Sequence, residues 1–406
     1  MEKLRVFTAF SGYDSQMMAL DRLNINYDCV GWSEIDRHAI EAHNALYPQY
    51  KDRNLGDISQ INWINVPDFD LFTYSSPCQD FSNAGLQMGG EKNSGTRSSL
   101  LWECEKAIRE KRPKYLLMEN VAALVEKKFI KLFNKWQFTL EEIGYNNYAR
   151  VLNAKDYGVP QNRKRVFVVS IRKDLDETFY FPQSFRLEKR LKDILEPQVD
   201  KQFYLSDKLI NFFNKNSEMN KSCGNGFRFK PQNGNNVAFS VTTHAGNRMD
   251  DNFIIEPICL NSKVDEKQPS VQDRIYDINA IFPALTTGFH PSIFEPVNII
   301  GSMQKNSFRG SINGYAPCIT SACGMGGGQT PMITYSNFRI RKLTPRECFR
   351  LMGVSENQIE ILLSCGISNS QLYKLAGNSI VVDVLYYIFR NLFIPEKSDN
   401  KILTLF

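Results

Sequence analysis

Apolar runs of strand length alternate with helix-length patterns through the first 175 residues. The expected strands cover residues 4–9, 27–32, 69–74 and 115–118, and the expected helices cover residues 15–23, 37–46, 98–110 and 121–143. Strands that alternate with helices of this length form βαβ units, whose right-handed crossovers build a parallel sheet covered on both faces. The pattern therefore predicts an α/β, doubly wound, mostly parallel sheet that binds its ligands at the carboxyl ends of the strands.

The pattern changes between residues 180 and 336, where short extended pieces rich in Asn and Gly predict a second domain of strands and loops. Helical character returns at Thr344, a plausible N-cap with Pro345 at the first helical position, and a further helix is expected from Val381 to Phe393. We therefore expect a first domain at 1–178, an inserted domain at 179–336, and a segment at 337–406 that completes the first domain.

A degenerate Thr-rich repeat occurs in the middle region, at residues 239–243, 283–287 and 317–321. Its unequal spacing excludes a solenoid. The copies are either β-strands that favour Thr or loops that present hydroxyls and glycine amides to phosphates and base edges. The sequence leaves both interpretations open.

Composition indicates an ordinary globular protein of 406 residues, 42% of them hydrophobic and 23% charged. Its nine cysteines and four histidines form neither CxxC pairs nor a zinc pattern, so we expect no structural disulfides and no metal. The N-terminus lacks a signal-peptide pattern, and no run of about 18 apolar residues occurs, so we expect a cytoplasmic protein without membrane contact. The net charge of +5 permits a polyanionic partner without proving one.

Cys78 follows an apolar run directly behind Pro77, where a parallel strand passes into a loop. Reactive groups collect at such positions. A single cysteine is more often a small hydrophobic residue than a nucleophile, so the neighbouring motifs must decide between the two interpretations.

The ends of the first strands carry candidate groups for an adenosine-containing cofactor. After the first strand, Phe10-Ser11-Gly12 would let backbone amides approach a ligand. Glu34 suits a ribose diol, although an exposed strand-end glutamate is equally plausible. Asp57 could accept from an adenine amino group between Ile35 and Ile58, or simply form an Asx turn. No phosphate-clamp glycine motif follows, which favours S-adenosylmethionine over a dinucleotide.

Glu119 ends a strongly apolar strand, where a carboxylate is costly unless it is used or paired. Arg163 and Arg165 alternate at the start of another strand and would share one face. An exposed basic edge is one interpretation of the two arginines. Beside a Cys and a Glu, a guanidinium could instead polarise a carbonyl oxygen and activate the thiol.

Taken in order, these elements resemble the cytosine-5 DNA methyltransferases of bacterial and phage type. The resemblance rests on motifs spread over nearly the whole chain outside the middle domain, namely Phe10-Ser11-Gly12, Glu34, Gly56-Asp57-Ile58, Pro77-Cys78-Gln79, 97–100, Met118-Glu119-Asn120-Val121, Gln161-x-Arg163-x-Arg165, 341–353 and Gly377-Asn378-Ser379. It implies a class I, Rossmann-like methyltransferase fold in which the middle domain is a target-recognition domain. Two motifs depart from the family pattern, since Asp14 and Ser15 replace glycines in one and Ser76 replaces a proline in the other.

The resemblance also implies a mechanism. Cys78 would attack C6 of a cytosine flipped out of duplex DNA, Glu119 would hold N3 and the amino group, and Arg165 would hold O2. Arg163 would support Glu119, and the segment 79–96 would close over the base. Water is the default acceptor of the C5 proton.

Further residues receive roles by the same resemblance. The cofactor S-adenosylmethionine would contact the groups named above together with Tyr13, Pro77, Leu100, Asn378 and Ser379. Candidate DNA contacts are Gln79, Ser82, Arg228, Arg248, Arg274, Arg309 and Thr320.

The sequence thus predicts a monomeric DNA (cytosine-5)-methyltransferase that serves a restriction-modification system, with a cognate endonuclease, or an orphan or phage protective role. One alternative is an RNA (tRNA) cytosine-5 methyltransferase of the same fold. The other is a non-enzymatic DNA-binding protein, which would have no need to keep Cys78, Glu119 and both arginines together.

Overall fold

The computed structural model describes residues 3–77, 100–257, 275–277, 292–294, 299–304, 307–311, 331–334 and 338–394. Contacts divide the chain into two compact units. The first unit comprises Met1–Arg190, Val237–Asn247 and Pro345–Phe406, and the second comprises Leu191–Asn236 and Arg248–Thr344. These bounds differ from the expected uninterrupted insertion at 179–336, because residues 237–247 return to the first unit.

A six-stranded sheet forms the centre of the first unit, in the order β2-β1-β3-β4-β7-β5. Neighbours from β2 to β4 run parallel, whereas β7 is antiparallel to both β4 and β5. The sheet is therefore mostly parallel, as predicted. Its strands are β1 Leu4–Ala9, β2 Tyr27–Ser33, β3 Leu71–Tyr74, β4 Tyr115–Val121, β5 Tyr145–Asn153 and β7 Lys164–Arg172. The short strand β6 Gln161–Asn162 lies outside this sheet.

Helices connect and cover these strands. They are α1 Ser15–Arg22, α2 Arg37–Leu46, α3 Leu101–Lys111, α4 Ile130–Ile143, α6 Pro345–Leu351, α7 Glu356–Ser364, α8 Asn369–Asn378 and α9 Val382–Phe393. The helix expected over 121–143 begins only at Ile130, because β4 continues to Val121 and a 3-10 turn occupies Ala122–Val125. Helix α6 starts at Pro345, directly after Thr344, as predicted.

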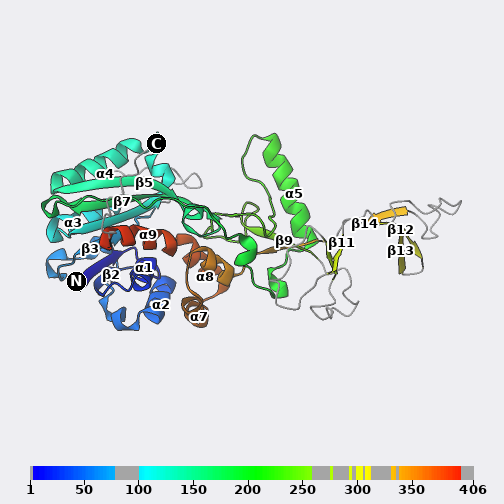
Figure 1. Cartoon of the computed structure of the whole chain (residues 1–406), viewed down its shortest axis with the longest axis horizontal. Coiled ribbons are helices and arrows are strands. Elements are labelled where there is room, and N and C mark those ends of the chain that lie inside the picture. The colour runs from blue at the N-terminus through cyan, green and yellow to red at the C-terminus, as the bar shows by residue number, and fades with distance from the viewer. Residues whose placement is uncertain are drawn as a thin grey trace, which may run out of the picture. The chain divides into compact units, whose positions relative to one another are not determined.

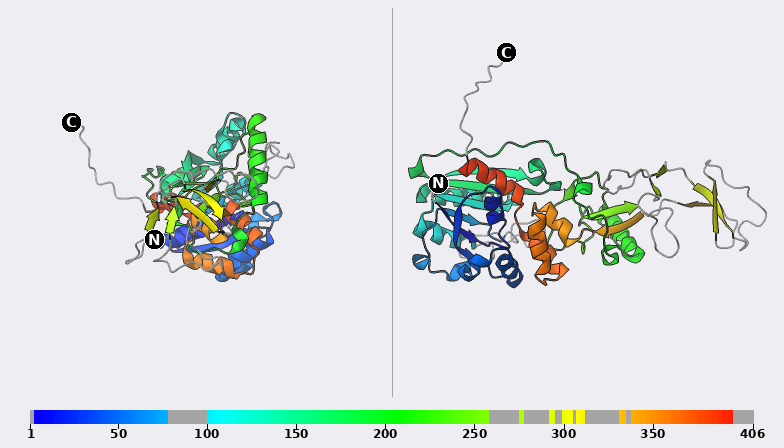
Figure 2. Two further views of the ribbon diagram at one scale, coloured as in Figure 1. Left: turned by 90° about the vertical axis from the view of Figure 1, so that its right-hand side faces the viewer. Right: turned by 60° about the horizontal axis from the view of Figure 1, so that its bottom comes forward.

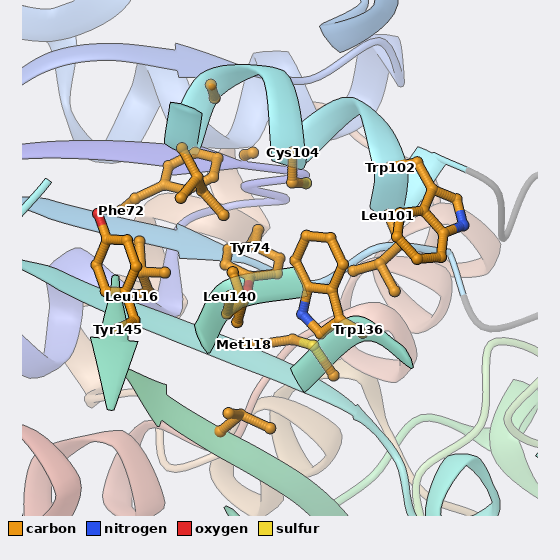
Figure 3. Close-up of a cluster of buried hydrophobic side chains, with 14 of the residues drawn as sticks. Phe72, Tyr74, Leu101, Trp102, Cys104, Leu116, Met118, Trp136, Leu140 and Tyr145 are labelled. Carbon is orange, nitrogen blue, oxygen red and sulfur yellow. The ribbon is translucent and has the colours of Figure 1, made fainter. Parts of the chain in front are cut away.

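Helices α3 and α4 cover one face of the sheet through a large aromatic and aliphatic cluster (Figure 3). Tyr74 and Met118 enter it from β3 and β4, and Trp136 enters it from α4. The ring centroids of Trp102 and Trp136 lie 5.4 Å apart in an edge-to-face arrangement. Side chains alternate along a strand, so Glu119 projects from the opposite face of the sheet to Met118.

Helices α1 and α9 pack against each other on that opposite face, where α9 lies beside the strands (Figures 1 and 2). The segment Asn369–Phe393 is long and apolar enough to pass a length-and-hydropathy test for a membrane span, but 61% of the tested window is buried inside the protein. The segment comprises the separate helices α8 and α9. Burial and interruption are typical of core helices in a globular domain.

The second unit contains a 16-residue helix, α5 Asp207–Ser222, which the sequence pattern did not reveal. Most of its apolar residues, among them the buried Phe213, lie in the first two turns, so the helical period is short. Ser206 caps the start of the helix by accepting from the Leu209 amide. The described strands of the unit are β9 Phe253–Pro257, β10 Ile275–Asp277, β11 Ser292–Phe294, β12 Ile299–Gln304, β13 Ser307–Ser311, β14 Pro331–Thr334 and β15 Phe338–Lys342. β9 and β15 pair antiparallel.

Candidate active site

The turn after β1 is built from backbone that L-residues rarely adopt. Phe10, Gly12 and Asp14 have φ values of 54°, 58° and 68°. Glycine adopts such values without strain, and Asp tolerates them better than most residues. Asp14 is fully buried, and its carboxylate accepts from the Thr8 hydroxyl at 2.7 Å and from the Met17 amide at 3.1 Å. These bonds explain how Asp14 can stand where the family has glycine.

Glu34, at the end of β2, holds this turn together. Its Oε2 accepts from the Gly12 amide at 3.0 Å, and its Oε1 accepts from the amides of Ile35 and Asp36 at 2.8 and 2.9 Å. Asn54 supports the same corner, because its amide donates to the Glu34 carbonyl and its oxygen accepts from the Gly56 amide at 3.0 Å. The sequence analysis missed Asn54, since its only signal was a position two residues before Gly56.

The space beside this turn fits an adenosine-containing ligand with a polar tail. A Cβ added at Gly12 or at Gly56 would meet nothing within 4 Å, so both glycines border open space. The Ser11 hydroxyl is buried and has no hydrogen-bond partner within the described part of the chain. Ile35 exposes 71% of its surface, which leaves an apolar side chain available beside Glu34.

Other predicted cofactor residues have different surroundings. Asp57 is exposed and accepts from the Ser59 amide at 2.9 Å, so the Asx-type capping geometry is present. Ile58 is 3% exposed and belongs to the core cluster, so much less of its surface than that of Ile35 is accessible. Leu100 also packs against that cluster. Ile35 is therefore the apolar side chain most accessible to a ring.

Tyr13 links the turn to the C-terminal segment. It is fully buried, and its hydroxyl lies 2.6 Å from the Ser379 hydroxyl. Burial raises the pKa of Tyr13 to about 12, against the opposing effect of the Ser379 hydrogen bond. Asn378, next to Ser379, is exposed at the end of α8. The motif around Ser379 thus lies against the turn after β1, as a shared cofactor site requires.

Glu119 lies between donors from the two neighbouring strands of the sheet. Arg165 Nε lies 3.1 Å from Glu119 Oε1, and Ser75 Oγ donates to Glu119 Oε2 at 2.6 Å. The Glu119 side chain is 6% exposed and that of Arg165 is 21% exposed. Arg165 therefore contacts the Glu119 carboxylate, a support that the sequence analysis assigned to Arg163, and the contribution of Ser75 was not foreseen.

A further hydrogen bond joins Ser76 and Asn120, the residues that follow Ser75 and Glu119. Asn120 Nδ2 donates to the Ser76 carbonyl at 3.2 Å, and both residues are buried. Together with the Ser75–Glu119 hydrogen bond, this bond holds the segment that leads from β3 to Pro77 against the end of β4. Cys78, the expected nucleophile, lies outside the described residues, as do Gln79 and Ser82.

Two buried cysteines, Cys29 and Cys104, are poor candidates for this chemistry. Burial raises the pKa of both thiols, which disfavours the reactive thiolate.

Arg163 is buried, at 4% exposure, and does not form an exposed basic edge. Its guanidinium donates to the carbonyls of Val241, Gly377 and Ser379, each at 2.9 Å, and to the Ser240 hydroxyl at 3.1 Å. Arg163 thereby connects the start of β7 with the cofactor-side segment around Ser379. Arg163 and Arg165 line one small pocket with Phe167, so they share one face, as the alternation predicted.

The first copy of the Thr-rich repeat, at residues 239–243, belongs to the first unit. The short strand β8 Ala238–Phe239 pairs parallel with β6, and the Val241 amide donates to Gln161 Oε1 at 2.9 Å. A Cβ added at Gly377 would lie 2.5 Å from the Thr243 nitrogen, so glycine is needed for this close approach. The first copy therefore has a structural role. The other two copies, at residues 283–287 and 317–321, lie outside the described residues.

Two predicted DNA-contacting arginines are described in the second unit, and both have intramolecular partners. Arg228 donates to the Phe227 carbonyl at 2.9 Å. Arg248 pairs with Asp250 at 3.1 Å and lies 5.4 Å from the centroid of the Phe227 ring. Arg274, Thr320 and the side chain of Arg309 lie outside what the structure describes.

A family model described as C-5 cytosine-specific DNA methylase matches residues 4–393 of the chain. The chain belongs to this family. Its members are S-adenosylmethionine-dependent in general, and the family assigns the protein as a DNA (cytosine-5)-methyltransferase.

Relatives of this methyltransferase by sequence include bacterial and phage enzymes, and a methyltransferase of Entamoeba histolytica shares its fold. The type II methyltransferase M2.ScrFI of Lactococcus lactis subsp. cremoris is 33% identical, over 96% of this chain and 99% of that protein. The orphan methyltransferase M.SPRI of Bacillus phage SPR is 30% identical, over 97% and 98%. The solved structure of the Entamoeba histolytica methyltransferase EhMeth is 16% identical with a TM-score of 0.63, covering 97% of this chain and 99% of that one, which shows a shared fold.

Proposed function

We propose that the protein transfers a methyl group from S-adenosylmethionine to C5 of a flipped cytosine within a specific sequence of duplex DNA. The observation that carries the proposal is the Glu119 carboxylate, which lies between Arg165 and Ser75. Ser75 precedes Cys78 by three residues in the sequence. A buried carboxylate with an arginine partner, together with a cysteine that follows the same strand end, supplies the groups that a covalent attack on a pyrimidine needs.

The cofactor would bind at the turn after β1, and when bound it supplies the methyl group. Glu34 would accept from the ribose hydroxyls, because three backbone amides hold its carboxylate in place and leave acceptor capacity on the oxygens. The Ser11 hydroxyl would contact the polar tail, and Ile35 would cover the adenine face. Asp57 and Asn378 are exposed at the neighbouring strand and helix ends, from which polar contacts could be made.

Cytosine C5 is a weak nucleophile, and the proposed chemistry overcomes this by covalent catalysis. The Cys78 thiolate attacks C6, which makes C5 an enamine carbon able to take the methyl group. Glu119 binds N3 and the amino group, while Arg165 faces O2 and offsets the charge that develops on the ring. Loss of the C5 proton to water and departure of Cys78 then complete the reaction.

The target base must leave the duplex before Cys78 can reach C6. In this proposal Gln79 and Ser82 contact the DNA beside the flipped base. Arg228, Arg248, Arg274, Arg309 and Thr320 are proposed contacts of the recognition domain. The protein would act as a monomer in the cytoplasm, either beside an endonuclease of the same specificity or as an orphan enzyme.

Bisulfite sequencing of DNA from cells that express the protein tests the proposal. We expect protected cytosines confined to one or a few sequence contexts, and none above background in cells that express Cys78→Ala. Methyl transfer to purified duplex DNA and to tRNA provides the second comparison. Transfer to tRNA with no transfer to duplex DNA would replace the proposal by its RNA-directed alternative.

A further inference from the structure

Ser75 directly follows β3 and lies beside Glu119, which is on the neighbouring strand β4. In the parallel register, Tyr74 pairs with Met118, so the next step along each strand brings Ser75 beside Glu119. Ser75 Oγ donates to Glu119 Oε2 at 2.6 Å, a length typical of a hydroxyl bound to an ionised carboxylate. The hydrogen bond is therefore a consequence of strand register and not of a chance surface contact.

The two donors on Glu119 act on different oxygens. Arg165 lies against Oε1 from β7, whereas Ser75 binds Oε2 from the end of β3. The terminal torsion of a glutamate is broad, so a single donor leaves the carboxylate plane free to turn. A second donor on the other oxygen fixes that plane, and Ser75 supplies it.

A serine hydroxyl can donate to the carboxylate without adding a second charge to the site. We propose that Ser75 is a positioning residue for Glu119, which fixes the carboxylate toward the N3 and amino edge of the cytosine. This inference rests on the function proposed above, in which Glu119 binds that edge.

The test compares single-turnover methyl transfer by Ser75→Ala and Ser75→Thr. Loss of a hydrogen bond to a charged group corresponds to about a 10- to 100-fold loss, so we expect Ser75→Ala to lose that factor in rate. The Kd values for S-adenosylmethionine and for DNA should stay within about twofold of the wild type, because the effect falls on the transition state. Ser75→Thr keeps the hydroxyl and should stay within about threefold of the wild-type rate.

Ser170→Ala is a matched control. Ser170 is buried on β7, and its hydroxyl binds Asn147 Oδ1 at 2.7 Å, so the variant loses a bond of nearly the same length within the same sheet. We expect Ser170→Ala to lower the melting temperature without lowering the rate. A rate loss equal to that of Ser75→Ala would assign the Ser75 effect to general weakening of the sheet and overturn the inference.

A double-mutant cycle with Glu119→Gln decides whether Ser75 acts through Glu119. In the Glu119→Gln background, Ser75→Ala should change the remaining rate by less than about twofold. The inference would be overturned if Ser75→Ala lowered the methyl-transfer rate of Glu119→Gln by the same factor as that of the wild type. It would also be overturned if Ser75→Ala alone kept the wild-type rate. An inactive wild-type protein would instead overturn the proposed function, so the two failures are distinguishable.

Discussion

Arg165 Nε lies 3.1 Å from the Oε1 atom of Glu119, and both side chains project from the face of the sheet away from the α3 and α4 cluster. Val121 of β4 pairs with Arg165 of β7, so Glu119 lies diagonally across from the arginine on the same face. The antiparallel pairing of β4 with β7 therefore places the Arg165 guanidinium beside the proposed catalytic carboxylate of Glu119.

Replacing Glu119 with Gln should reduce turnover far more than cofactor affinity. The amide group keeps the shape of the side chain but places a donor where Ser75 or Arg165 also donates. We expect kcat to fall by about 100-fold or more, since one preorganised polar group commonly contributes that factor. The Kd for S-adenosylmethionine, measured by calorimetry, should change by less than about twofold. Equal losses in both quantities would contradict the role assigned to Glu119.

Replacing Glu34 with Ala should weaken cofactor binding. The change removes the acceptor of the Gly12 and Ile35 amides and the proposed acceptor of the ribose hydroxyls. We expect the Kd for S-adenosylmethionine to rise by about 10- to 100-fold. Glu41→Ala is the control, because Glu41 pairs with the exposed Arg37 on α2. An unchanged Kd for Glu34→Ala would place the ribose elsewhere.

Asp14 should be more costly to replace with Ala than with Gly. Both changes remove the bonds to Thr8 and Met17, but only Ala keeps a Cβ at a φ of 68°. A left-handed non-glycine residue costs about 1–2 kcal/mol. Urea unfolding should therefore show Asp14→Gly to be more stable than Asp14→Ala by about that amount. Equal free energies of unfolding would show that the turn carries no such strain.

Arg163→Lys should destabilise the protein although it preserves the charge. A lysine ammonium cannot span the separate carbonyls of Val241, Gly377 and Ser379, which the planar guanidinium reaches together. We expect the free energy of unfolding to fall by about 2–4 kcal/mol, because buried carbonyls lose their donor. Arg37→Lys, on an 84% exposed side chain, should stay within about 0.5 kcal/mol. Similar free energies of unfolding for Arg163→Lys and Arg37→Lys would contradict the role of Arg163 in binding these carbonyls.

Sequence patterns predicted the catalytic sheet well because they depend on local periodicity. The expected strand at 4–9 and helix at 37–46 coincide with β1 and α2, and α9 ends at Phe393 as expected. The expected common face of Arg163 and Arg165 also appears. These features follow from alternation along strands and from the convergence of strand ends in a doubly wound sheet.

Features that depend on distant contacts were not predictable in the same way. The return of residues 237–247 to the first unit depends on pairing between β6 and β8, which are separated by more than 70 residues of sequence. Ser75 lies 44 residues before Glu119 and gained its role only from the register of β3 with β4. Helix α5 was missed because most of its apolar residues lie in the first two turns, which leaves the rest of the helix without a hydrophobic period.

The most direct test of the account is covalent capture of the protein on DNA that carries 5-fluorocytosine at the target site. Fluorine cannot leave as the C5 proton does, so the adduct between the Cys78 sulfur and C6 should persist after methyl transfer. We predict a denaturation-resistant protein–DNA complex that requires S-adenosylmethionine and is absent for Cys78→Ala. The same complex formed by Cys78→Ala would contradict the assignment of Cys78 as the nucleophile.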